Sequence, residues 1–164
     1  MMTGKRDLPE SHQALPLRTS RIAFAPDESS AAVRLSAETP RILIVEDDFL
    51  VATEMENALV DAGFEVVGVA SSAEEAIALA LEHRPILAVM DVHLGTRRDG
   101  VEAALELFSH HNIRCIFATA HIDTETRRRA EPALPLGWIA KPYTMISLVA
   151  LVETVVTQLG GVEQ

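Results

Sequence analysis

The chain has 164 residues, 48% of them hydrophobic and 23% charged, and a formal net charge of −10. These values are typical of a soluble globular protein with one domain and a tail. The single cysteine, Cys115, excludes a disulfide framework. No apolar run has the length of a membrane span and no secretory signal pattern opens the sequence, so we expect a cytoplasmic protein with no membrane contact.

The charge is unevenly distributed along the chain. Residues 1–40 contain five basic and five acidic side chains, so the whole net charge of −10 falls on residues 41–164. An acidic domain without a broad basic face is a poor binder of nucleic acid, because such binding depends on contacts to phosphates. The one basic cluster, Arg127-Arg128-Arg129, is predicted to be a solvated helix face, although it could equally dock an acidic partner.

Residues 1–40 contain four prolines and show no sustained hydrophobic period. We interpret them as an N-terminal extension that is mostly disordered or loosely docked, with a brief strand at 19–25 and a helical turn or two at 28–35. A misassigned start and a short docking arm are alternatives. The regular pattern that follows predicts one domain over residues 41–159 and a C-terminal tail at 160–164.

Five short apolar runs alternate with five segments of helical period. Short apolar runs are typical of strands that are buried on both faces of a parallel sheet, and Ile86–Met90 is the clearest of them. The first helix is predicted to stop at Gly63, and a capping box at residues 72–75 opens the second. The predicted strands are residues 41–45, 65–70, 86–90, 114–118 and 137–140, and the predicted helices are residues 49–62, 72–83, 99–111, 122–131 and 144–159. This order predicts an α/β fold, a doubly wound five-stranded parallel sheet with helices on both faces.

Polar side chains follow four of the five predicted strands. The first strand is followed by Glu46 and Asp47, the third by Asp91, the fourth by Thr119 and the fifth by Lys141. Asp91 alone would be interpreted as the cap of the next turn. However, the carboxyl ends of parallel strands meet at one edge of a sheet, and this is where α/β proteins bind ligands. The matching groups on the other strands therefore favour one shared site.

The residue types at this edge suit phosphoryl chemistry. Three carboxylates repel one another and need a cation, and Mg²⁺ accepts one or two carboxylates while keeping several waters. Lys141, the only lysine in residues 41–164, adds a compact positive charge for a phosphate. The hydroxyl of Thr119 can donate to a phosphoryl oxygen. Together these groups support an aspartate nucleophile that becomes an aspartyl phosphate.

As an ordered set, these strand ends resemble the receiver domain of two-component response regulators. The resemblance covers about residues 41–158 and implies a flavodoxin-like receiver fold in a bacterial phosphoprotein. The matching motifs are Ile-Val-Glu-Asp-Asp at 44–48, Val-Met-Asp at 89–91, Asp-Gly at 99–100, Ala-Thr-Ala at 118–120 and Lys-Pro at 141–142. Each motif is weak alone, but the ordered set is specific.

The resemblance assigns a metal site by position. Glu46 and Asp47 resemble the acidic pair that holds Mg²⁺, with Asp47 the direct ligand, and Asp91 resembles the phosphoacceptor that completes the set. His93 stands where the family offers a backbone carbonyl to the metal. Asp48 is a further acid after the pair and can cap the following helix instead.

The resemblance also assigns a phosphate-binding group and a switch. Lys141 resembles the phosphate-binding lysine, and Pro142 follows the peptide bond that is often cis in the family. Thr119 resembles the switch hydroxyl. Trp138 occupies the position of the aromatic switch residue, usually Tyr or Phe, and plain core packing explains it equally well.

Two features depart from the family pattern. The loop after Asp91 lacks the usual proline and is longer than the common form, which leaves its conformation open. The run Phe117-Ala-Thr-Ala-His121 is similar to a branch of atypical receivers with Phe-Ala-Thr-Gly, some of which switch by loop ordering.

His93 and His121 stand two residues after Asp91 and Thr119, where the family's residues flank the path of the attacking water. They are either solvated loop residues or residues that tune the lifetime of the phosphoryl group. A neutral imidazole could orient the water, and a charged one would bind the phosphoryl oxygens.

These features predict a single-domain response regulator that takes a phosphoryl group from a histidine kinase or histidine phosphotransfer protein. It would act through protein–protein contacts and would not turn over an external substrate. One alternative is an aspartate-nucleophile phosphohydrolase, although His93 stands where such enzymes place a second acid. Another is a constitutive interaction module with a vestigial acid site.

The last predicted helix carries two apolar stripes. Leu148, Leu151, Val152, Val155 and Leu159 form the stripe expected in the core. A second stripe consists of Met145, Val149, Val152 and Val156. Because a solvent-facing helix does not need both, this helix is predicted to form a homodimer or to dock a partner, unless the N-terminal extension covers it.

Overall fold

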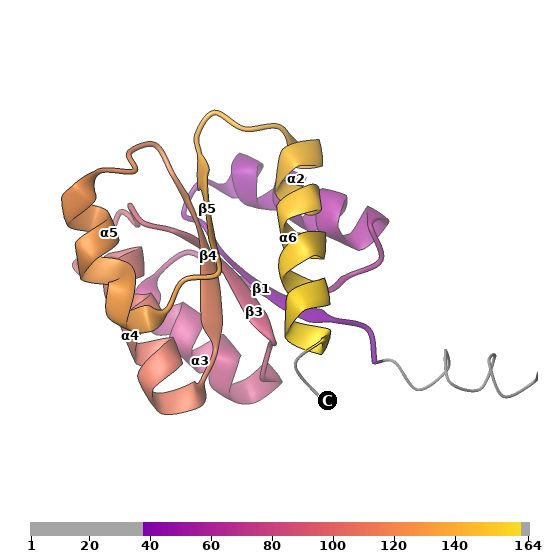
Figure 1. Cartoon of the computed structure of the whole chain (residues 1–164), viewed down its shortest axis with the longest axis horizontal. Coiled ribbons are helices and arrows are strands. Elements are labelled where there is room, and N and C mark those ends of the chain that lie inside the picture. The colour runs from indigo at the N-terminus through magenta and orange to yellow at the C-terminus, as the bar shows by residue number, and fades with distance from the viewer. Residues whose placement is uncertain (1–37, 162–164) are drawn as a thin grey trace, which may run out of the picture. The chain divides into compact units, whose positions relative to one another are not determined.

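The structure is a computed structural model that describes residues 38–161, so the predictions for residues 1–37 and 162–164 lie outside the described residues. Five strands and five α-helices follow one another in the predicted order, with one added turn of 3-10 helix (Figure 1). The strands are β1 (Arg41–Val45), β2 (Glu65–Ala70), β3 (Leu87–Asp91), β4 (Arg114–Thr119) and β5 (Gly137–Ala140). The helices are α2 (Phe49–Asp61), α3 (Ala73–His83), α4 (Gly100–His111), α5 (Thr124–Ala130), η1 (Glu131–Ala133) and α6 (Met145–Gly160).

All five strands are parallel and lie in the order β2-β1-β3-β4-β5. Helices α2 and α6 cover one face of the sheet, and α3, α4 and α5 cover the other (Figure 1). Each face has its own apolar core, one built around α2 and α6 and the other around α3 and α4. The predicted doubly wound fold is therefore confirmed. No helix among residues 38–161 is long and apolar enough to cross a membrane.

Strand β3 lies at the centre of the sheet, and all five of its residues are buried. It pairs with β1 on one side and β4 on the other, so Met90 lies beside Val45 and Asp91 beside Ala118. The chain order reverses between β1 and β3, which is the switch point where open α/β sheets bind ligands. The strand includes Asp91 and not Ile86, one residue later than predicted, and thereby fixes Asp91 at the carboxyl edge of the sheet.

Local caps explain the helix boundaries that differ from the predicted ones. The carboxylate of Asp99 accepts from the N–H of Glu102, and the N–H of Asp99 donates to the carboxylate of Glu102, so Asp99 is the N-cap and α4 begins one residue later than predicted. Asp123 caps α5 in the same position, which shortens the predicted helix at its start. The predicted box at residues 72–75 is half confirmed, because Glu75 N donates to Ser72 while the Glu75 carboxylate accepts from Ser71.

Arginines 127–129 of α5 are all exposed, as predicted for a solvated helix face, and each also makes a specific contact. Arg128 pairs with Glu125 on the same helix. Arg129 Nη2 lies 2.6 Å from Asp99 Oδ2, so this ion pair ties α5 to the first turn of α4. Arg127 covers one face of the Trp138 ring, 5.2 Å from its centroid.

On α6, three residues of the predicted core stripe, Leu148, Val152 and Val155, are fully buried, whereas Leu151 and Leu159 are only partly buried against the same core. The second stripe is half-buried, with Met145, Val149 and Val156 packed against the same core. The one large apolar side chain of this helix that stands free is Ile146, which is 83% exposed. Self-association or partner docking through α6 stays a prediction, and Ile146 is the residue best placed to carry it.

The first residue of α4, Gly100, packs directly against the carboxyl end of β3. Its N–H donates to the Val92 carbonyl, and a Cβ built on Gly100 would lie 1.8 Å from the carbonyl oxygen of Asp91. Only a residue without a side chain fits there. Gly160, near the end of α6, has no atom within 4 Å of its built Cβ and is the matched contrast.

We expect Gly100→Ala to lower the free energy of unfolding by about 3 kcal/mol, because the methyl group forces β3 and α4 apart. Gly160→Ala should change it by less than about 1 kcal/mol. Urea denaturation of the two variants and the wild type measures both. Equal effects at the two positions would contradict the tight packing inferred at Gly100.

Candidate functional site

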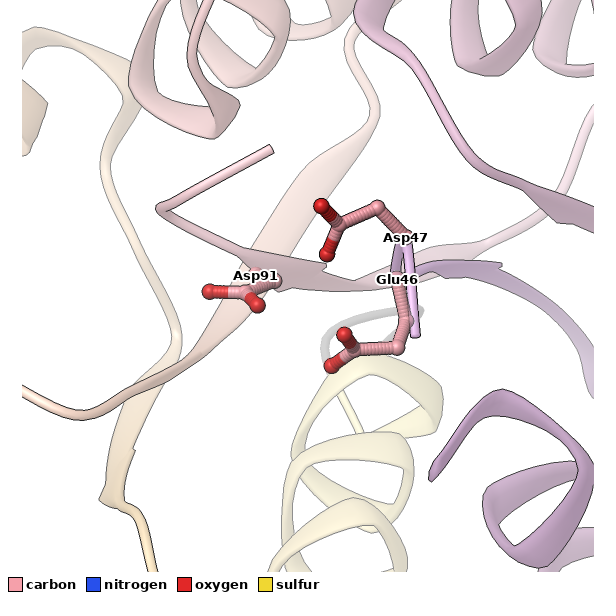
Figure 2. Close-up of side chains that lie close together, drawn as sticks. All are labelled: Glu46, Asp47 and Asp91. Atoms are coloured by element: carbon pink, nitrogen blue, oxygen red, sulfur yellow. The ribbon is translucent and has the colours of Figure 1, made fainter. Parts of the chain in front are cut away.

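The ends of β1 and β3 bring three carboxylates into one small space. Glu46 and Asp47 follow β1, and Asp91 is the last residue of β3. One carboxylate oxygen from each lies within 4.8 Å of the others, and Figure 2 shows the three side chains reaching into the same space. Glu46 and Asp91 are buried, whereas Asp47 is exposed. The donor atoms are all carboxylate oxygens, which is the ligand type that Mg²⁺ prefers.

A single ammonium group lies between the two buried acids. Lys141, directly after β5, places Nζ 2.8 Å from Glu46 Oε2 and 2.8 Å from Asp91 Oδ2. One cation against three carboxylates leaves the site with an excess of negative charge, which a bound divalent cation would offset. The Lys141–Pro142 peptide bond is cis, in line with the raised probability expected from the sequence.

The protonation behaviour of this cluster follows from burial and hydrogen bonding. Burial raises the pKa of Glu46, and the hydrogen bond from Lys141 offsets only part of that rise. Burial alone would lower the pKa of Lys141, but its hydrogen bonds to Asp91 and Glu46 outweigh this, so that its pKa is raised and it stays an ammonium. The lysine is therefore a permanent positive charge beside the two acids.

The next two acids after Glu46, Asp47 and Asp48, make different hydrogen bonds. The Asp48 carboxylate accepts from Leu50 N and Val51 N as the N-cap of α2, so it caps the helix and is not part of the cluster, as the sequence suggested. Asp47 Oδ2 accepts from the backbone N–H of Gly95 at 2.9 Å. Sequence reasoning missed Gly95, and the only signal for it was the unusual loop that follows Asp91.

The hydroxyl of Thr119 lies at the end of β4 and is fully buried. It is 3.5 Å from His93 Nδ1 and 3.4 Å from the N–H of His121. The two imidazole rings stand edge to face with their centroids 6.4 Å apart. With Asp91 and Lys141, both histidines line a pocket of about 330 Å³. The pocket thus gathers the residues that the sequence assigned to phosphoryl acceptance, phosphate binding and lifetime, and Thr119 is buried next to two of them.

The backbone of His93 also contributes to the site. Its N–H donates to Asp91 Oδ1 at 3.0 Å, so both oxygens of Asp91 have a donor, from His93 on one and from Lys141 on the other. These two bonds hold the carboxylate of Asp91 in one orientation. The assignment of the His93 carbonyl as a metal ligand stays a prediction.

Trp138 on β5 lies away from the carboxylates, on the side of the sheet that α5 covers. Its ring stacks on Phe117 with centroids 4.6 Å apart and an interplanar angle of 26°. The opposite face meets Arg127, and the ring forms part of a surface pocket of about 480 Å³ with Arg114 and Arg128. Trp138 is therefore a partly buried packing residue, and its role as a switch stays a prediction.

Sequence analysis did not identify Tyr143 as a residue beside the carboxylate cluster. Its hydroxyl is buried beside the cluster and is the only buried side-chain polar atom among residues 38–161 without a hydrogen-bond partner. Burial raises the pKa of Tyr143 to about 12. Because it is the only tyrosine of the chain, its ionisation can be observed directly.

We expect the folded chain to form tyrosinate with a midpoint near pH 12 and the urea-unfolded chain near pH 10. Between these values the folded state keeps a proton that the unfolded state has lost, so the free energy of unfolding falls as pH rises through this range. Tyrosinate absorbance after a rapid pH jump measures the folded midpoint. Tyr143→Phe should remove the part of the fall in the free energy of unfolding that this proton causes. A folded chain with the same midpoint as the unfolded chain would contradict the inference that the Tyr143 hydroxyl is buried.

Comparison with known proteins identifies the family. The model of the response regulator receiver domain matches residues 42–153. The transcriptional regulatory protein PdtaR of Mycobacterium tuberculosis is 34% identical over 118 residues, 72% of this chain and 57% of PdtaR. The phyllosphere-induced regulator PhyR of Methylorubrum extorquens is 31% identical over 141 residues, 85% of this chain and 51% of PhyR. The chain thus spans little more than half the length of these relatives.

Solved structures agree with this result. The signal receiver domain of a modulated diguanylate cyclase from Desulfovibrio desulfuricans G20 is 36% identical, with a TM-score of 0.67 over 74% of this chain and 96% of that one. The chemotaxis protein CheY4 of Vibrio cholerae, at 23% identity and a TM-score of 0.65, covers 71% of this chain and 98% of its own and shows the fold alone. The family match, the relatives, the order of the strands and the acids at the strand ends all agree, and the chain belongs to the response regulator receiver domain family.

Proposed function

We propose that this receiver accepts a phosphoryl group on Asp91 from a histidine kinase or a histidine phosphotransfer protein. The observation that carries the proposal is the convergence of Lys141 and of two further acids on the carboxylate of Asp91. Asp91 is buried and held by two donors, yet it lines an open pocket that a phosphoryl group can enter. A structural acid that only capped a turn would need neither the lysine nor the pocket.

Phosphoryl transfer requires an oxygen of Asp91 to attack phosphorus while the bond from phosphorus to the donor's histidine nitrogen breaks. The nitrogen keeps the electron pair, and the phosphoryl group passes to the aspartate without other exchange of atoms. Mg²⁺ held by Glu46, Asp47 and Asp91, with the backbone carbonyl of His93, would neutralise the charge of the incoming group.

The chain's own residues then hold the product. Lys141 is already 2.8 Å from the attacking carboxylate and supplies a donor for a phosphoryl oxygen. The Thr119 hydroxyl has only long contacts, 3.4 to 3.5 Å, so little is lost when it turns to the new oxygens. Loops 92–99 and 119–124 would rearrange around the added charge and change the surface offered to a partner protein. Trp138, the single tryptophan of the chain, would report the change by its fluorescence.

We expect acetyl phosphate with Mg²⁺ to add one phosphoryl group to the wild type and none to Asp91→Asn, which keeps the shape but removes the nucleophile. Intact-protein mass spectrometry measures the product. Asp47→Asn should suppress labelling through weaker Mg²⁺ binding, whereas Asp48→Asn, the matched acid outside the cluster, should not.

The same assay separates the other two functions. Continuous release of phosphate without accumulation on Asp91 would indicate a phosphohydrolase. A chain that neither binds Mg²⁺ nor takes up phosphate would indicate an interaction module with a vestigial site. Either result would contradict the proposal.

We also expect the two histidines to set the lifetime of the aspartyl phosphate. Both rings line the pocket over Asp91 and could orient the water that attacks phosphorus. The double variant His93→Ala with His121→Ala should lose the phosphoryl group about tenfold more slowly than the wild type. This effect is smaller than the usual contribution of a general base, because water can still reach the phosphorus by other paths. The measurement is the decay of phosphorylated protein after removal of acetyl phosphate. His110→Ala with His111→Ala, at the end of α4, is the control pair.

A further inference from the structure

The three acids of the cluster are not equally well held. Glu46 accepts from Lys141 and from the N–H of Asp48, and Asp91 accepts from Lys141 and from the N–H of His93. Asp47 is exposed, and among residues 38–161 its carboxylate accepts one hydrogen bond, from the backbone N–H of Gly95 at 2.9 Å. The orientation of Asp47 therefore depends on a loop that comes from another strand.

We infer that Gly95 is a positioning residue for the metal-binding carboxylate of Asp47. This inference rests on the proposed metal site and adds a residue to it. An exposed aspartate samples several rotamers, and fixing one of them when an ion arrives costs free energy. A donor on Oδ2 fixes the rotamer beforehand and leaves Oδ1 for the ion. Outer donors of this kind orient metal-binding carboxylates in many sites.

The loop after β3 is held by contacts on both sides of Gly95, so the position of the Gly95 N–H is fixed. Leu94 is buried at 6% exposure, directly before Gly95. Thr96 N donates to the Leu94 carbonyl, and the Thr96 hydroxyl donates to the carbonyl of Arg98 at 2.9 Å. Arg98 is in turn 2.6 Å from the carboxylate of Glu106 on α4. The loop thus has one buried anchor before Gly95 and a chain of contacts after it.

The backbone of Gly95 lies close to the carboxylate. A Cβ built on Gly95 would lie 3.0 Å from Asp47 Oδ2, tighter than nine in ten real Cβ contacts, so a side chain there would push the exposed carboxylate back by a few tenths of an ångström. Proline would remove the donor itself, because it has no N–H. The loop's lack of a proline at this position is what makes the bond possible.

The test is the Mg²⁺ affinity of the chain, measured by calorimetry with magnesium chloride and no phosphoryl donor. Gly95→Pro should weaken binding by about tenfold, the lower end of the effect of losing an outer donor. Arg97→Pro is the matched control, because it stiffens the same loop and the N–H of Arg97 makes no hydrogen bond within residues 38–161. Binding by Gly95→Pro within twofold of the wild type would overturn the inference.

A second measurement does not depend on the folding of a proline variant. In the metal-free chain, Asp47→Ala should shift the amide proton resonance of Gly95 and speed its exchange with solvent, because the acceptor is gone. Asp48→Ala removes the neighbouring acid, which bonds Leu50 and Val51, and should leave Gly95 unchanged. A Gly95 amide that is indifferent to Asp47→Ala would also overturn the inference.

Labelling of Asp91 by acetyl phosphate at saturating Mg²⁺ keeps the two proposals apart. Labelled wild type together with unaltered Mg²⁺ binding by Gly95→Pro refutes the role of Gly95 and leaves the proposed function standing. A wild type that is never labelled refutes the proposed function, whatever Gly95 does.

Discussion

The edge of the sheet depends on one ammonium group shared by two buried carboxylates. Lys141 follows β5, Glu46 follows β1 and Asp91 ends β3, so three strands that are not consecutive in sequence meet in one ion-pair network. Burying two acids without a cation would cost several kcal/mol, because each charge loses its hydration. The lysine offsets this cost only in part, which is why the pKa of Glu46 remains raised. The fold thus keeps a site that still favours a further cation.

The parallel sheet provides the rigid frame that this network needs. Strand β3 is buried along its whole length, and Gly100 brings α4 against the carbonyl of Asp91. Asp91 therefore cannot move without disturbing the core. By contrast, Asp47 is exposed, and one hydrogen bond from Gly95 holds its carboxylate. Asp91 is thus held by the core of the sheet, whereas Asp47 is held by the loop that follows β3.

Two links lead from this site towards the protein's surface. The N-cap of α4, Asp99, closes the loop after β3 and also pairs with Arg129 of α5. At the next strand, Thr119 lies two residues after Phe117, whose ring stacks on Trp138 under Arg127. Both links end on α5, which carries the densest group of positive charge in an otherwise acidic domain. Both sets of contacts therefore connect the strand ends with a surface whose charge differs from that of the rest of the domain.

The sequence by itself determined the strands, their alternation with helices, and the residues at the strand ends. These features depend on local periods and on which residue follows each apolar run, so they can be recognised without knowing the fold. The same local logic identified Asp48 as a cap. Boundaries shifted by one or two residues where a single side chain, Asp99 or Asp123, captured the first amides of a helix.

Only the tertiary structure decided which of these groups touch. The contact between Gly95 and Asp47 joins residues 48 positions apart, and that between Lys141 and Glu46 joins residues 95 apart. The half-burial of the second stripe of α6 and the unpartnered hydroxyl of Tyr143 depend in the same way on packing across the sheet. Hydrogen bonds and burial of this kind are set by the spatial order of the strands, which no local period encodes.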